Sequence, residues 1–146
     1  MATSTFLSNA TINITQGATT TDLSDQANQV TLTIGYDALE TTAFSGSSPQ
    51  GHTYAQGLQS VDVSITFFLS YGTTEVEGVL AACVGTGTTT LVISPSGTTE
   101  SATNPEYTIA NCMLADFTPI NSTVGELATV QVTFTGGTWV RDITAP

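Results

Sequence analysis

The sequence has 146 residues, of which twelve are acidic and only one, Arg141, is basic, so the formal net charge is −11. Such a chain has no cluster of lysine and arginine with which to hold phosphates, and this argues against nucleic-acid recognition. Hydrophobic residues make up 40% of the chain, which is enough for one core, so we expect a single domain over residues 1–146.

Several other classes of protein are also disfavoured. No apolar run approaches the roughly 20 residues of a membrane span, and the N-terminal residues do not form a secretory signal. The two cysteines, Cys83 and Cys112, lie among apolar residues and predict buried thiols. His52 is the only histidine, there is no lysine for a phosphate-binding loop, and no nucleophile elbow is present. We therefore expect no metal, no cofactor and no enzymatic activity.

In chain order, alternation of apolar and polar residues predicts seven or eight β-strands separated by Gly, Ser, Pro and Asn. The candidate strands cover residues 11–15, 30–36, 61–69, 90–94, 107–117, 128–135 and 138–143. In 61–69 the residues Val61, Val63, Ile65, Phe67 and Leu69 share one face, and in 128–134 Ala128, Val130, Val132 and Phe134 do the same. We expect these two apolar faces to form one core. The opposite faces carry Thr, Ser, Gln and Asp.

One short α-helix is predicted at about residues 74–84. Thr73 or Thr74 would be its N-cap, Glu75 and Glu77 would lie in its first turn, and it would end at Gly85. A second, weaker signal for a helical turn covers residues 22–28.

The least regular segment, residues 45–57, is rich in Gly and Ser and predicts a long loop. Ordering such a loop costs conformational entropy without any internal gain, so we expect it to contact another subunit. The candidate contact residues are Ser47, Pro49, His52 and Tyr54.

Two stretches carry a resemblance to a known family. The first contains "DLSDQANQVTLTIGYDALETTAF" and "YAQGLQSVDVSITFFL", and the second is "ATNPEYTIANCMLADFTPINSTVGELATVQVTFTGG". In order and pattern, residues 20–140 resemble the tail tube (major tail) proteins of long-tailed bacteriophages. Members of that family often carry Trp and Arg after the helix and in the last strand. Here the helix leads into "ACVGTGTTTLVI", so inter-ring salt bridges cannot be carried over.

The resemblance implies a mainly-β fold of the β-sandwich or barrel type, with a short flanking helix and a long loop. It also implies that copies form rings, commonly hexameric, which stack into a tube within the virion tail after synthesis in the host cytoplasm. The partners would be other copies and other tail proteins, and DNA would pass without specific binding. Residues on the polar strand faces are candidates to line the lumen: Asp62, Ser64, Thr66, Thr129, Gln131 and Thr133.

Other functions remain open from the sequence. The negative charge has a simpler explanation in solubility, and threonine suits any solvent-facing sheet. A capsid decoration or cement protein would also be small, acidic and β-rich. A carbohydrate-binding β-sandwich on a virion or cell surface is a third reading, although its aromatic candidates Tyr54, Tyr71, Tyr107 and Trp139 are scattered along the chain.

Overall fold

The computed structural model describes residues 7–44 and 51–146, which form one short helix and eight strands. In chain order the elements are β1 (Thr11–Gln16), β2 (Thr19–Asp22), β3 (Ala27–Glu40), β4 (Tyr54–Phe68), α1 (Val76–Cys83), β5 (Thr89–Ser94), β6 (Glu106–Leu114), β7 (Thr129–Thr135) and β8 (Thr138–Asp142). The mainly-β prediction is confirmed. None of the described helical segments is both long and apolar enough to cross a membrane.

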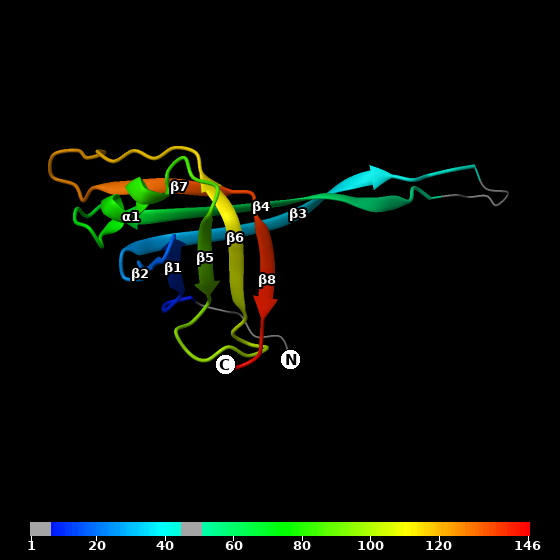
Figure 1. The fold of residues 1–146 in the computed structure, drawn as a ribbon, viewed down its shortest axis with the longest axis horizontal. Coiled ribbons are helices and arrows are strands. Elements are labelled where there is room, and N and C mark those ends of the chain that lie inside the picture. The colour runs from blue at the N-terminus through cyan, green and yellow to red at the C-terminus, as the bar shows by residue number, and fades with distance from the viewer. Residues whose placement is uncertain (1–6, 45–50) are drawn as a thin grey trace.

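The strands form one antiparallel sheet that is bent into two halves. Its order is β2-β1-β5-β6-β7-β4-β3, and β8 pairs with β6 beside this path. In Figure 1 the strands β1, β5, β6 and β8 run across the direction of β3, β4 and β7. β6 belongs to both halves, because its first part pairs with β5 and β8 whereas Met113 and Leu114 pair with β7. The bend therefore folds the apolar side of each half over the other.

The bend in β6 has a local cause. Asn111 has a φ of 59°, a left-handed conformation that asparagine tolerates better than most residues. Next to it, Gly137 links β7 to β8 with a φ of +86°, and a Cβ there would lie 2.2 Å from the Ala110 carbonyl oxygen. Only glycine allows the backbones to approach this closely.

The two predicted apolar faces meet in the core, as expected. β4 and β7 are neighbours, with Val63 opposite Phe134 and Ile65 opposite Val132. Their inward residues are all at most 2% exposed: Val61, Val63, Ile65, Phe67, Val130, Val132 and Phe134. Apolar residues of β1, β5 and β6 complete the same cluster from the other half of the sheet. The alternation of apolar and polar residues along β4 and β7 therefore predicts correctly which side chains pack in the core.

Helix α1 is close to its predicted position, but the predicted N-cap is wrong. Glu75 is the N-cap and makes no side-chain capping bond. Ser70 takes over this role, since its hydroxyl accepts from the Val76 N–H at 3.3 Å and its carbonyl oxygen accepts from the Glu77 N–H at 3.0 Å. The weaker prediction of a helical turn over 22–28 is confirmed only as a short turn and not as a helix. The Gln26 N–H donates to the Leu23 carbonyl oxygen at 3.1 Å, and β3 already begins at Ala27.

The predicted loop 45–57 is shorter than expected, because β4 begins at Tyr54. Here β3 and β4 continue beyond the body as a two-stranded ribbon, which we call the arm (residues 36–44 and 51–58; Figure 1). Gly57 suggested a loop, but it lies where the register shifts between Tyr36 and Ala38, and a Cβ at Gly57 would be 2.8 Å from Asp37 Cβ. A glycine required by a bulge was thus mistaken for a loop signal.

The core pairing predicts a large difference between neighbouring substitutions. Val63→Asp and Val132→Asp would each place an unpaired carboxylate where the side chain is now at most 2% exposed. Such burial costs several kcal/mol, on the order of the whole stability of a domain, so both variants should be unfolded by circular dichroism. Ser64→Asp and Thr133→Asp point the other way and should keep a cooperative urea transition. Equal damage from both pairs would contradict the assignment of the two faces.

The buried thiols give a second prediction. Desolvation by burial raises the pKa of Cys112 from 9.0 to about 11 and also raises the pKa of Cys83. Because the thiolate is the reactive form, the Cys112 thiol should react with a disulfide reagent at pH 8 at least about a hundredfold more slowly in the folded chain than in urea. The rate should rise as the pH approaches 11. Rapid labelling of both thiols in the folded chain would contradict this burial.

Candidate assembly surfaces

The half-sheet β3-β4-β7 presents a hydroxyl-rich surface on the side away from the core. The register brings Thr33, Asp62 and Thr135 side by side. We call this surface the polar face, and it consists of Gln29, Thr31, Thr33, Ser60, Asp62, Ser64, Thr66, Thr129, Gln131, Thr133 and Thr135. All six residues predicted to line a lumen therefore lie on one continuous face.

The polar face consists of neutral polar side chains and one acid, and it carries no positive charge. Asp62 is its single ionisable residue and is exposed. The Gln131 side-chain amide donates to the Ser64 hydroxyl at 3.2 Å, so part of the face is linked by its own hydrogen bonds. A phosphate near this surface would meet an acid and hydroxyl groups but no ammonium or guanidinium group, and binding of phosphate depends on such cations.

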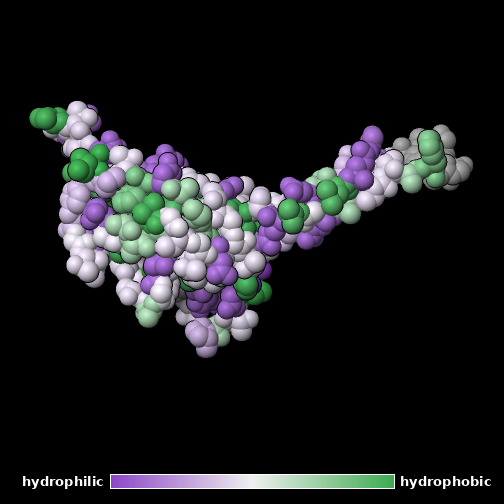
Figure 2. Space-filling model, turned by 45° about the horizontal axis from the view of Figure 1, so that its top comes forward, coloured by the Kyte–Doolittle hydropathy of each residue, from purple (hydrophilic) through white to green (hydrophobic). Residues whose placement is uncertain are grey.

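The arm exposes large apolar side chains far from the core. The exposed fractions are 54% for Leu39, 109% for Phe44, 60% for Tyr54 and 79% for Leu58. Figure 2 shows apolar residues along this projection among polar ones. Exposed apolar residues gathered on a projection mark a contact surface.

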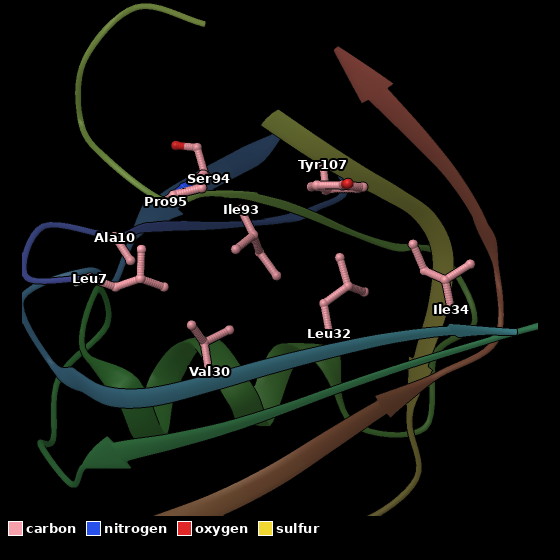
Figure 3. A pocket seen from close by; sticks show the side chains of 9 residues that line it. All are labelled: Leu7, Ala10, Val30, Leu32, Ile34, Ile93, Ser94, Pro95 and Tyr107. Atoms are coloured by element: carbon pink, nitrogen blue, oxygen red, sulfur yellow. The ribbon is translucent and has the colours of Figure 1, made fainter. Parts of the chain in front are cut away.

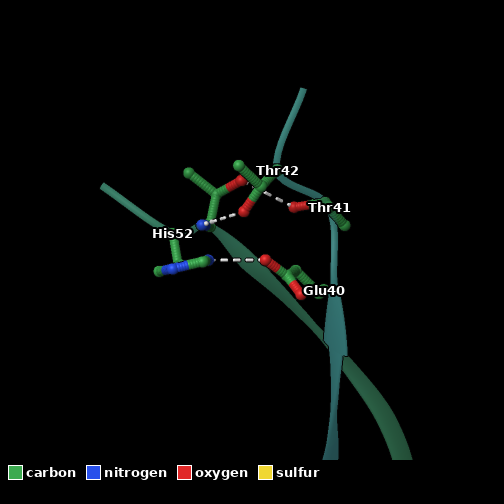
Figure 4. Close-up of polar contacts among 5 residues, drawn as sticks. Glu40, Thr41, Thr42 and His52 are labelled. Carbon is green, nitrogen blue, oxygen red and sulfur yellow. Dashed lines mark hydrogen bonds and ion pairs between the residues drawn. The ribbon is translucent and has the colours of Figure 1, made fainter. Parts of the chain in front are cut away.

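Polar contacts join the two sides of the arm where the strands end (Figure 4). The His52 ring nitrogen Nδ1 lies 2.6 Å from the Glu40 carboxylate. The Thr41 N–H donates to the Thr53 carbonyl oxygen at 2.8 Å, and the Thr53 N–H donates to the Thr42 hydroxyl at 2.9 Å. The ribbon is thus held together up to this point.

The predicted contact residues divide into two groups. The rings of His52 and Tyr54 lie near each other on the arm, with centroids 6.4 Å apart, and both residues are exposed. Ser47 and Pro49 fall in residues 45–50, outside the described part of the chain.

A second exposed apolar surface lies at the opposite end of the molecule. Residues 115–128, here called the far loop, connect β6 to β7 and project away from the arm tip (yellow to orange in Figure 1). Ile120 is 80% exposed, Val124 102% and Leu127 78%. Sequence reasoning missed this surface, although its apolar residues are flanked by Pro119 and Gly125 and follow no strand period.

The third surface is an apolar groove of about 350 Å³ between β3 and the other half of the sheet (Figure 3). It is lined by Leu7, Ala10, Val30, Leu32, Ile34, Ile93, Ser94, Pro95 and Tyr107. The inward residues Val30, Leu32 and Ile34 of β3 are only half-buried, because β3 is the last strand of the sheet. The alternation of β3 was visible in the sequence, but its position at the edge was not.

None of these surfaces brings together the groups of a metal or catalytic centre. Within residues 7–44 and 51–146, no set of three or more His, Cys, Asp or Glu residues could hold a metal ion. His52 is beside Glu40 at the exposed end of the arm, and both thiols are buried.

Comparisons of sequence find no matching protein-family model and no matching curated protein. Comparison of structures finds similar chains. One belongs to the sheath/tube terminator of an extracellular contractile injection system, PVC, in the extended state, with a TM-score of 0.66, 14% identity and coverage of 97% of this chain and 98% of that one.

Two further structures are similar over almost the whole chain. The tube-terminating cap of the anti-feeding prophage matches with a TM-score of 0.61 and 13% identity, covering 99% of this chain and 95% of that one. The tail of an empty GTA particle matches with a TM-score of 0.55 and 10% identity, covering 92% and 95%. Identities this low concern the fold alone. The chain has a fold found in components of phage-like tails and contractile injection systems, and the comparisons do not single out the tail tube of long-tailed phages.

Proposed function

We propose that this chain is a structural tail protein whose copies form rings of six that stack into a tube. The proposal rests above all on the polar face, a continuous hydroxyl-rich sheet surface without a base, in a fold that tail components share. Strands of the half-sheet β3-β4-β7 from each copy would line the lumen, and DNA would slide past without being held. The chain as a whole would be a single domain of the particle.

Two observations support this proposal over the alternatives. The structures similar to this chain are parts of tails and injection systems, which favours a tail role over a capsid decoration role. A carbohydrate platform would need several exposed aromatic rings on one surface. Tyr107 and Trp139 do lie together, 6.3 Å apart, but both are half-buried, and Tyr54 lies on the arm.

A terminal ring is the second candidate within the tail. It is favoured by the descriptions of two similar structures as a terminator and a terminating cap. Negative-stain electron microscopy of the purified chain separates the two candidates, since long tubes indicate the tube body and single rings indicate a terminator.

Because six copies would carry six times the charge of −11, assembly should quicken with salt, which limits repulsion to about 8 Å at physiological ionic strength. A chain that stays monomeric at all salt and protein concentrations would contradict the proposal.

The arm should make a contact between subunits. Leu39→Ser together with Leu58→Ser removes two apolar side chains that are 54% and 79% exposed in the single copy. This variant should keep its thermal transition within a few degrees and lose assembly in sedimentation velocity. Leu39→Met with Leu58→Met keeps the apolar area and should assemble normally. Normal assembly of the serine variant would remove the arm from the interface.

Asp62 tests which face lines the lumen. Asp62→Lys replaces the one charge of the polar face with a base, so a ring of six would hold six lysines against passing DNA. Particles that incorporate this variant should assemble and should eject DNA more slowly, by about tenfold or more, with the delay shrinking at high salt. Asp62→Asn is the matched control and should eject at the normal rate. An unchanged rate for the lysine variant would place Asp62 outside the lumen.

A further inference from the structure

The only arginine of this acidic chain makes no ion pair with the described residues of its own copy. Arg141 lies on β8 and is exposed. Across residues 7–44 and 51–146, the one ion pair is that between His52 and Glu40. The twelve acids of the chain all lie within these ranges, so the exposed guanidinium group is available for a carboxylate of another molecule.

The nearest acids point away from Arg141 for a geometric reason. On β8, Asp142 is adjacent to Arg141 and therefore lies on the opposite face of the strand. On that opposite face Asp142 pairs in register with Glu106. Partial burial, a side-chain hydrogen bond shared with Glu100 and the charges of Glu100 and Asp142 all raise the pKa of Glu106. The three acids repel one another while the only base of the chain faces elsewhere.

The side of β8 that carries Arg141 is the side of the apolar groove. Arg141 is directly opposite Tyr107 in the β6–β8 register, and Tyr107 lines the groove. Trp139, two residues earlier on the same face, stacks at an angle on Tyr107 and donates from its indole N–H to the Tyr36 hydroxyl at 3.3 Å. Figure 3 shows β8 (red) rising beside the end of the groove where Ile34 lies. The groove is therefore lined mainly by apolar side chains, and Arg141 lies on the same face of the sheet as Tyr107 in its wall.

A ligand for this groove needs apolar side chains with a carboxylate close to them. The far loop of the same chain offers both in one turn, because Val124 is 102% exposed, Leu127 is 78% exposed and Glu126 lies between them. The backbone holds this turn in shape, with the Glu126 N–H donating to the Thr123 carbonyl oxygen at 3.1 Å and Gly125 at a φ of +86°. The turn projects from the end of the molecule away from β8 (Figure 1), so it is presented to another copy.

We propose that the turn 123–127 of a second copy docks in the groove, with Val124 and Leu127 against its apolar walls and Glu126 on Arg141. The inference rests on the proposed self-assembly and names one of its contacts. Different surfaces meet in such an interface, and interfaces of this kind close into rings or propagate along a stack. In an assembly of strongly acidic copies, the single base would then fix where the next copy binds, since complementary charge sets register and specificity.

The absence of lysine makes this contact directly testable. Arg141→Lys keeps the positive charge and introduces the only lysine of the chain. A water-soluble carbodiimide joins an amine to a touching carboxylate as an amide, with loss of water. Assemblies made from equal amounts of isotopically heavy and light Arg141→Lys chains should give a heavy–light peptide pair in the mass spectrum, in which the introduced lysine is linked to Glu126. Adding Glu126→Gln should abolish that pair while leaving the fold unchanged.

Controls separate this inference from the proposed function. Thr138→Lys places a lysine on the opposite face of β8 from Arg141 and should not link to Glu126. Arg141→Gln and Glu126→Gln should each raise the protein concentration needed for assembly about tenfold, and the double variant should be no worse than either one. The Arg141→Lys chain could form rings or tubes in which the introduced lysine links only to acids of its own copy, or to Asp37 or Glu40 of the arm. That result would overturn this inference and leave the proposed function standing. A chain that never assembles would overturn both.

Discussion

The alternation of apolar and polar side chains on β4 and β7 is the constraint on which the rest of the structure depends. Because the period of a strand is two, burying Val63 and Val132 forces Ser64 and Thr133 to the other side. The same burial thus creates the core and the polar face. Since the sheet is bent at Asn111 and Gly137, one half can cover the apolar side of the other and leave the polar side open.

The second constraint is the excess of negative charge, which limits ion pairs within one copy and would make separate copies repel one another. With twelve acids and one base, almost no internal ion pairs can form, so stability must come from apolar burial and hydrogen bonds. In the proposed assembly, copies of the chain would repel one another unless apolar contacts and the few complementary charges held them together. Such contacts would give a role to the large apolar side chains of the arm and the far loop, which are exposed in the single copy.

The positions of these exposed side chains fit the proposed assembly, in which each copy would contact more than one neighbour. The arm and the far loop lie at opposite ends of the molecule (Figure 1). The groove is lined by Val30, Leu32 and Ile34 of β3, the last strand of the sheet. In an isolated copy, the outer edge of β3 pairs with no other strand of the described ranges, and such edges are prone to unspecific pairing. Assembly that covers the edge would remove this hazard and make use of the same surfaces.

The sequence by itself determined most of the elements and the two faces of the long strands. The mainly-β class, the one short helix, the shared core of 61–69 and 128–134 and the buried thiols all follow from local periodicity and composition, because each depends only on neighbours along the chain. The tertiary structure decided which strands are neighbours, which strand lies at the edge and how far the arm reaches. Gly57 serves a bulge, and Ser70 rather than Thr73 or Thr74 accepts from the first N–H groups of α1. Both depend on segments meeting in space. The sequence alone shows that Arg141 is the only base. Its place opposite Tyr107, which lines the groove, depends on the pairing of β8 with β6 and is therefore visible only in the fold.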